Sequence, residues 1–173
     1  MVATQPLPKP KDQIEKASAA TQTQTQPTAA GEVMVVESRF GTLQVQLQHI
    51  LTLPQGLLGF GEHHAFGLAP LPNGQHPQFQ VLQCLEAPDL AFLVAPLNIQ
   101  SNAIDESDLQ EACGNLGIDR ETLAVFLIVT VRRNEDVAHI SMNMRAPLFV
   151  DVTNRTARQY VLPNNKYSIR HAL

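Results

Sequence analysis

The feature that most constrains the fold of this chain is a succession of short apolar segments, each bounded by turn residues. Leu43, Val45 and Leu47 alternate with three glutamines, which is the period of a strand with one buried face. Residues 123–131 are the most apolar stretch and are rich in β-branched side chains. Because that stretch is shorter than ten residues, it favours a central strand over a helix. These patterns predict an all-β chain.

About ten such segments follow one another at close spacing. They are residues 33–36, 43–47, 50–53, 64–68, 78–85, 90–95, 123–131, 140–144, 148–152 and 157–162. Turn residues such as Pro54, Gly56 and Gly59 separate them. Sequential short strands with turn signals predict antiparallel meanders that close into a β-barrel-like domain.

One short helix interrupts the strands. Ser107 is predicted as its N-cap, because Gln110 follows three residues later and completes the pattern of a capping box. Gly114 is predicted to end the helix after about two turns. The acidic residues around Ser107 suit the positive end of the helix dipole.

The chain divides into a tail and a domain. Residues 1–32 are rich in Gln, Thr, Ala and Pro, with a low-complexity run from Ser18 to Pro27. Their few large apolar residues cannot offset the entropy lost on ordering. We therefore expect a disordered tail over residues 1–32 and one barrel-like domain over residues 33–173.

The charge of the domain limits its partners. The chain has a net charge of -4, and the basic and acidic residues of 1–32 balance. Residues 33–173 therefore carry the whole acidic excess. A nucleic-acid-binding protein requires a basic surface to neutralise phosphates. We expect no direct binding of nucleic acid, and a basic protein partner is electrostatically favoured.

The cysteines and the apolar segments indicate a cytoplasmic protein. Cys84 and Cys113 stand in apolar or small-residue surroundings, outside any CxxC pair, as buried reduced thiols do. The N-terminus lacks the apolar run of a signal peptide. The longest apolar run, residues 123–129, is far shorter than the roughly 20 residues of a membrane-spanning helix.

Four segments, in the same order along the chain, resemble the FliW family. Residues 53–60, LPQGLLGF, are similar to the family's proline–glycine turn, with Leu53 where phenylalanine is usual and Gly61 where an acid is common. Residues 89–96 resemble its central strand and following proline, and residues 140–150 a later strand that contains an Asn–Ala–Pro pattern. Residues 159–171 resemble its C-terminus.

The resemblance covers residues 33–173 and implies a function. FliW proteins have a β-barrel-like fold and no cofactor. They bind CsrA, a small basic RNA-binding repressor, and relieve its block on flagellin translation. They also bind flagellin, so the two partners compete and couple flagellin synthesis to flagellum assembly. The resemblance therefore implies a binding protein and not an enzyme.

Residue patterns typical of catalysis or metal binding are missing. There is no GxSxG, HExxH, P-loop or GxGxxG motif, and no Cys/His set has zinc spacing. His63 and His64 are adjacent, so in a strand they would face opposite sides and could share a metal only in a turn. We expect no catalytic residue and no metal or cofactor site.

Three segments and one aromatic residue are candidates for a partner interface. Exposed aromatic side chains carry much interface energy, a strand end can accept an added strand, and acids attract a basic partner. Each feature also has a purely structural interpretation, as a core residue, a turn or a solvated helix start. The candidate residues are Phe60, Pro96, Leu97, Asn98, Asp105, Glu106, Asp108, Asn143, Arg145 and Pro147.

Two other classes of function stay open at this point. A barrel of short strands can enclose a small-molecule pocket, although the absence of Trp and the presence of only two Tyr and seven Phe leave few aromatics to line it. An unrecognised hydrolase would need a histidine and a carboxylate buried together within hydrogen-bond reach.

Overall fold

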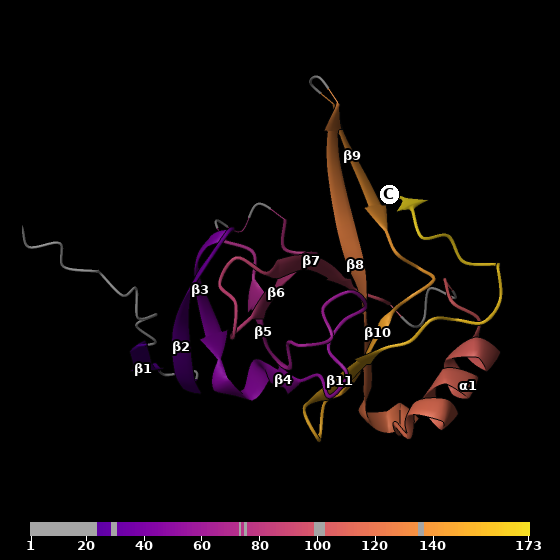
Figure 1. Ribbon diagram of the computed structural model, residues 1–173, viewed down its shortest axis with the longest axis horizontal. Coiled ribbons are helices and arrows are strands. Elements are labelled where there is room, and N and C mark those ends of the chain that lie inside the picture. The colour runs from indigo at the N-terminus through magenta and orange to yellow at the C-terminus, as the bar shows by residue number, and fades with distance from the viewer. Residues whose placement is uncertain (1–23, 29–30, 73, 75, 99–102, 135–136) are drawn as a thin grey trace, which may run out of the picture.

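Strands dominate the computed structural model, which describes residues 24–28, 31–72, 74, 76–98, 103–134 and 137–173 (Figure 1). The helical elements are η1 (Leu47–His49), α1 (Glu106–Leu116) and η3 (Arg120–Thr122). The strands are β1 (Gln24–Thr28), β2 (Gly31–Ser38), β3 (Gly41–Gln46), β4 (Ile50–Thr52), β5 (Ala65–Pro70), β6 (Gln80–Cys84), β7 (Ala91–Pro96), β8 (Leu123–Asn134), β9 (Val137–Met142), β10 (Leu148–Asp151), β11 (Thr156–Gln159) and β12 (His171–Ala172).

The larger sheet closes on itself. Its strand order is β10-β11-β4-β5-β6-β7-β8-β9-β12, and β10 also pairs with β8. The pairing of β10 with β8 therefore joins β4, β5, β6, β7, β8, β10 and β11 into a ring. All pairs in the ring are antiparallel except β11 with β4. The predicted mainly antiparallel, barrel-like fold with one α-helix is confirmed for the described residues.

Strand β8 has apolar side chains on both faces, which explains its unbroken apolar sequence. Phe126 points into the barrel, where it packs with Leu82 and Val150. Val125 and Leu127 point outward into a second apolar cluster with Leu109 and Ala112 of α1. The strand predicted to be central is thus central because α1 covers its outer face.

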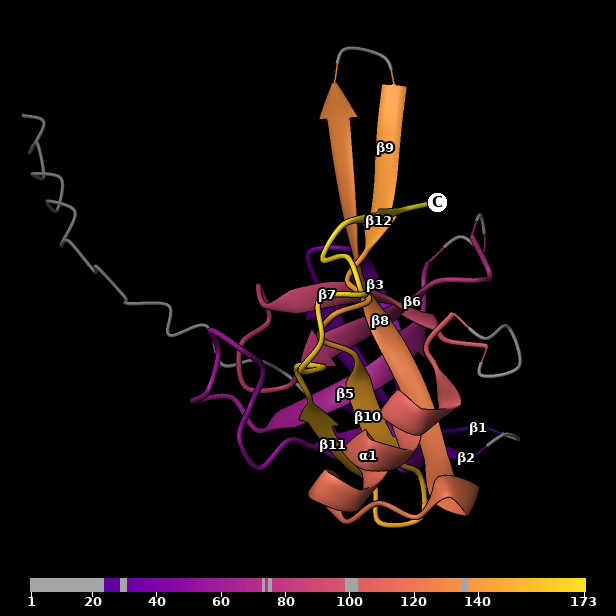
Figure 2. The same cartoon turned by 90° about the vertical axis from the view of Figure 1, so that its right-hand side faces the viewer.

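Strands β8 and β9 continue beyond the barrel as a hairpin (Figure 2). Their pairing runs from Val129 opposite Met142 to Asn134 opposite Val137. The predicted strand ended at Val131, so β8 is three residues longer than expected. Cross-strand pairing with β9 sustains these extra residues although their side chains are polar.

The ends of α1 differ from the predicted ends. The N-cap is Asp105, without a side-chain cap hydrogen bond, and Ser107 lies inside the first turn. The helix runs through Gly114 for eleven residues and ends at Gly117, which has a left-handed φ of 67°. Both predicted ends were wrong. The cause at the N-terminus is a tertiary contact, because the backbone N–H of Asp105 donates to the hydroxyl of Tyr167.

Part of the predicted tail belongs to a strand. Residues 24–28 form β1, which pairs with β2 from Gln24 opposite Val35 to Thr28 opposite Gly31. The tail boundary at residue 32 is therefore too late for this segment. Residues 1–23 and 29–30 lie outside the described residues.

Candidate protein-binding surface

Predicted interface residues from three distant segments lie on the side of the barrel that α1 covers (Figure 1). Leu97, which follows β7, packs against a cluster that contains Leu109 of α1 and Met144. Tyr167, from the C-terminal segment, is buried in the same cluster. Residues 96–98, 105–108 and 143–147 thus share one apolar base, with the C-terminal segment beside them.

Ion pairs hold the acidic start of α1 against the rest of the protein. Lys166 Nζ lies 2.7 Å from Asp105 Oδ2 and 3.5 Å from Asp108 Oδ2. Arg120 Nη2 lies 2.6 Å from Glu106 Oε1. The hydrogen bond from Lys166 to Asp105 is the main reason why the pKa of Lys166 is raised. Much of the charge predicted to attract a partner is therefore paired within the chain.

Asp108 has a structural position. Its side chain is 12% exposed, and Oδ2 accepts hydrogen bonds from Asn164 Nδ2 at 3.0 Å and from the Tyr167 hydroxyl. The bond from Tyr167 is the main cause of the lowered pKa of Asp108, and burial raises the pKa of Tyr167. This geometry assigns Asp108 to fastening the C-terminal segment to α1.

The surroundings of α1 stay acidic after these pairs are counted. Residues 103–121 contain six carboxylates and one arginine, and Lys166 from the C-terminal segment adds one further positive charge. Glu111 is exposed, and no ion pair to it occurs within the described residues. We call residues Asp105, Glu106, Glu111, Asp119 and Glu121 the acidic face.

The segment from Asn143 to Pro147 is a bend between β9 and β10, and two of its three predicted contact residues shape it. Asn143 Oδ1 accepts hydrogen bonds from the backbone N–H groups of Arg145 at 3.1 Å and Ala146 at 3.0 Å. Pro147 is buried. Arg145 is half-buried, and its Nη1 donates to Asn165 Oδ1 at 2.7 Å. Of the three residues, Arg145 thus fits the predicted role of a partner-contacting surface residue best.

The end of β7 is paired with β8. Pro96 stands opposite Phe126, and the N–H of Leu97 donates to the carbonyl of Val125 at 2.8 Å. The predicted open edge for an added strand is therefore occupied on the β8 side. Pro96 and Asn98 are exposed, whereas Leu97 is half-buried. Pro96 and Asn98 therefore retain accessible side chains beside the acidic face.

Phe60 packs in the barrel and does not join the other candidates. It is half-buried, and its ring meets that of Phe92 edge to face with 5.3 Å between centroids. Of its two predicted roles, the structure therefore favours the core residue over the exposed anchor.

A glutamine that the sequence did not single out connects the Phe60 turn to the bend at residues 143–147. Gln159 Oε1 accepts from the N–H of Leu58 at 3.0 Å, and Gln159 Nε2 donates to the carbonyl of Ala146 at 3.1 Å. Leu58 and Val161, 59% and 46% exposed, belong to the segments that Gln159 joins. Such exposed apolar side chains can supply binding energy at a polar-rimmed surface.

The geometry required for a hydrolase does not occur among the described residues. The ion-pair contacts of histidine with carboxylates are His63 with Glu62 at 3.9 Å and with Glu86 at 4.0 Å. Both distances exceed a hydrogen bond, and both carboxylates are exposed.

A cavity of about 450 Å³ lies between the η1–β6 segment on one side and strands β8 and β10 and the β10–β11 turn on the other. Its lining is mainly apolar, with Leu51, Leu68 and Phe126 among the buried members. The polar side chains Gln48, His49, Gln80 and Arg155 also line it, and all except half-buried Gln80 are exposed. The buried set of convergent polar groups that fixes a small ligand is therefore lacking in this cavity.

Comparison with known proteins decides the family. The sequence model of the FliW protein matches residues 34–173, which is nearly the whole predicted domain. The chain belongs to the FliW family. This confirms the resemblance carried by the four segments. Within the described residues, no helix has the length and apolar character needed to cross a membrane.

Relatives in this family are named flagellar assembly factors. The FliW of Desulfitobacterium hafniense (strain DSM 10664 / DCB-2) is 37% identical over 146 residues, which cover 81% of this chain and 91% of that protein. The FliW of Ruminiclostridium cellulolyticum is 31% identical over 140 residues, covering 80% and 93%. A crystal structure of the flagellar assembly factor FliW matches with a TM-score of 0.61 and 24% identity, covering 80% and 95%. That match supports the fold.

Proposed function

We propose that this protein is a cytoplasmic flagellar assembly factor whose output is binding and not turnover. In this proposal it binds a CsrA-type translational repressor and releases it from RNA, and flagellin competes for the same protein. The proposal rests on family membership, on the naming of the relatives as flagellar assembly factors, and on the resemblance to FliW described above.

The single observation that carries the repressor-binding step is the concentration of negative charge around α1. The domain has nine basic and thirteen acidic residues, and residues 103–121 alone contain six of those acids. A clustered acidic surface raises the association rate of a basic partner and fixes its orientation more than it adds affinity.

Further contacts would come from exposed apolar and polar residues outside the acidic face, which we call the border residues. Leu58 and Val161 are exposed, and Pro96 and Asn98 are exposed close to α1. In this proposal the acidic face orients the repressor, and these border residues with Arg145 complete the contact. Asp108, Asn143 and Pro147 contribute indirectly, because they hold the surface in shape.

The proposal is tested by mixing the purified full chain with purified CsrA and, separately, with flagellin. We expect a stable complex with each at micromolar concentration, and loss of the CsrA complex as flagellin is added. Isothermal titration calorimetry gives the stoichiometry and affinity. If neither protein binds at micromolar concentration, the proposed function is wrong, whatever the family of the chain.

Removing two negative charges from the acidic face should slow the association with CsrA. The double variant Glu106→Gln with Glu111→Gln is expected to lower the association rate constant about tenfold at low salt, with little difference at high salt. The matched control is Glu32→Gln with Glu37→Gln, because it removes the same charge from exposed positions on β2, at the other end of the molecule (Figure 1). Equal rates for the two variants in stopped-flow measurements at all salt concentrations would reject the role of the acidic face.

A further inference from the structure

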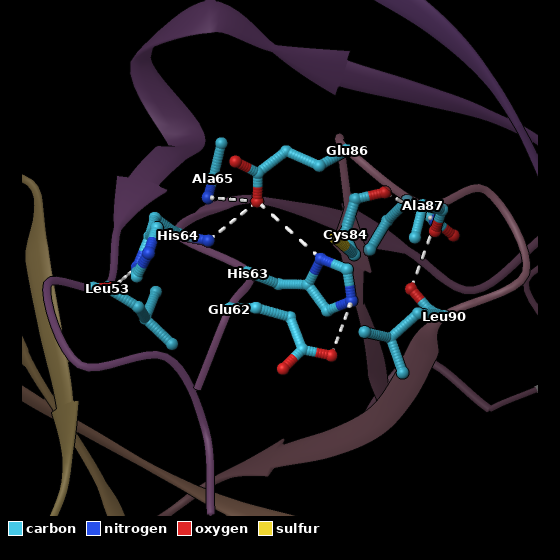
Figure 3. Close-up of polar contacts among 10 residues, drawn as sticks. Leu53, Glu62, His63, His64, Ala65, Cys84, Glu86, Ala87 and Leu90 are labelled. Carbon is cyan, nitrogen blue, oxygen red and sulfur yellow. Dashed lines mark hydrogen bonds and ion pairs between the residues drawn. The ribbon is translucent and has the colours of Figure 1, made fainter. Parts of the chain in front are cut away.

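Three potential metal ligands meet at the open end of the β5–β6 hairpin, where β5 begins and β6 ends. This site is remote from the acidic face. One ligand atom each from His63, Cys84 and Glu86 lies within 4.8 Å of the other two. Figure 3 shows the imidazole ring of His63 with Glu86 at one nitrogen and Glu62 at the other. From this cluster we propose a site for a transition-metal ion, with Zn²⁺ as the ion that its ligand types favour.

The register of the hairpin brings these residues together. Phe66 of β5 stands opposite Cys84 of β6, so the residues before β5 face those that follow β6. The carboxylate of Glu86 joins the end of β6 to the start of β5, because its Oε2 accepts hydrogen bonds from the N–H groups of His64 at 2.6 Å and Ala65 at 3.2 Å. His63 precedes β5 and lies outside any strand. The alternation of side chains between the two faces of a sheet therefore does not fix the direction of its side chain.

The turn that carries Glu86 is held by Gln83, which lies on the face of β6 opposite to that of Leu82 and Cys84. Gln83 is fully buried, and its Nε2 lies 2.8 Å from the carbonyl oxygen of Cys84, 3.0 Å from that of Pro88 and 3.2 Å from that of Leu90. A side chain that contacts several carbonyls of one turn fixes its backbone. Cys84 and Glu86 are therefore held on one rigid segment, as a preformed site requires.

His63 lacks a hydrogen-bond partner for either ring nitrogen within the described residues, although its side chain is only 23% exposed. Nδ1 lies 4.0 Å from Glu86 Oε2, and Nε2 lies 3.9 Å from Glu62 Oε1. Both distances are too long for hydrogen bonds. In a tetrahedral zinc site, nitrogen and oxygen ligands are about 3.3 Å apart and a sulfur lies about 3.5 Å from either. A shift of roughly 1 Å would close the cluster around an ion.

The ligand types select the metal. A thiolate, an imidazole and a carboxylate suit Zn²⁺, whereas Mg²⁺ and Ca²⁺ prefer oxygen ligands alone. The thiolate and the carboxylate together neutralise the two charges of the ion, which suits a site whose Cys84 is fully buried. The backbone N–H groups of His64 and Ala65 both donate to Glu86 Oε2 and fix the position of this carboxylate.

Glu62 has the place of a positioning residue. When Nδ1 of His63 binds the metal, Nε2–H faces the carboxylate of Glu62, the arrangement in which an outer carboxylate orients a histidine ligand. Three protein ligands leave one position for water, and Glu62 helps to hold the ring toward the ion.

The test titrates the full chain with Co²⁺, which replaces Zn²⁺ and gives a thiolate-to-metal charge-transfer absorption. We expect one ion per chain, displacement by Zn²⁺, and a higher thermal midpoint in zinc. Cys84→Ser should abolish the absorption, and His63→Ala and Glu86→Gln should each weaken binding by more than tenfold. Glu62→Gln should weaken it about tenfold with the absorption retained.

The matched controls are Cys113→Ser, which removes the other buried thiol, and His49→Ala, which removes an exposed histidine. Both should bind Co²⁺ as the unmodified chain does. Circular dichroism establishes that each variant is folded. Absence of a thiolate absorption in the unmodified chain, or an absorption that survives Cys84→Ser, would overturn the site. Neither result depends on CsrA or flagellin, so the proposed function is tested separately.

Discussion

Replacing Gly56 with alanine should lower the free energy of unfolding by about 3 kcal/mol or more. Gly56 has a φ of +62°, and a Cβ built on it would lie 2.3 Å from the carbonyl oxygen of Phe60 and 2.8 Å from the Cα of Gly61. Both neighbours are backbone atoms and cannot move aside as a flexible side chain would. The turn they form carries buried Leu57 into the barrel. Urea unfolding followed by circular dichroism measures the loss.

Two other glycines of the same loop distinguish crowding of an added Cβ from the cost of a positive φ. Gly59 also has a positive φ, of 86°, but no atom lies within 4 Å of its added Cβ. Gly59→Ala should therefore cost only about 1–2 kcal/mol. Gly61 has no positive φ, and its nearest neighbour would be 3.7 Å away, so Gly61→Ala should be nearly neutral. Equal losses for all three variants would contradict the described turn.

The second large effect concerns Asp108. Replacing Asp108 with alanine removes the acceptor shared by Asn164 and Tyr167 and one partner of Lys166. The equilibrium constant for local opening of the C-terminal segment should then rise by at least about tenfold. Amide hydrogen exchange reports this at Met144 and Leu162, whose N–H groups donate to Ser168 and Arg145.

Asp89→Ala is the control for Asp108→Ala, because Asp89 is an exposed acid on the β6–β7 turn. It should leave the exchange of both amides unchanged. Identical protection in the Asp108 variant and the unmodified chain would show that this carboxylate does not fasten the segment.

The same contact predicts a pH dependence with a definite sign. Hydrogen bonding, first from Tyr167, lowers the pKa of Asp108 in the folded protein, while a free aspartate titrates near pH 4. Its contribution is therefore fully present above about pH 4 and is lost as the pH falls through the lower folded pKa. The Asp108→Asn variant should lack this part of the acid destabilisation.

The sequence predicted the strands and the family well, because both depend on local patterns. The alternation at Leu43 and Val45 recurs as burial of both side chains in β3. The apolar run at residues 123–131 is β8, which α1 and the barrel cover on opposite faces. Residues 54–60 form turns, as predicted, and an alanine at Gly56 would clash with backbone atoms.

The helix ends and the partners of the acidic residues could not be predicted, since they depend on contacts distant in sequence. Tyr167 donates to Asp108 and accepts from the backbone of Asp105, about sixty residues away. Gln159 reaches back to Leu58 in the same way. The His63, Cys84 and Glu86 cluster has no standard spacing and forms only through the register of β5 with β6.

In the proposed function, this protein removes a repressor from RNA by binding it. The most direct measurement follows a fluorescent RNA bound to purified CsrA while the full chain is added. We predict that the RNA is released in proportion to added protein, that flagellin restores its binding, and that Glu106→Gln with Glu111→Gln slows the release. RNA that stays bound to CsrA at saturating concentrations of the protein would show that the proposed function is wrong.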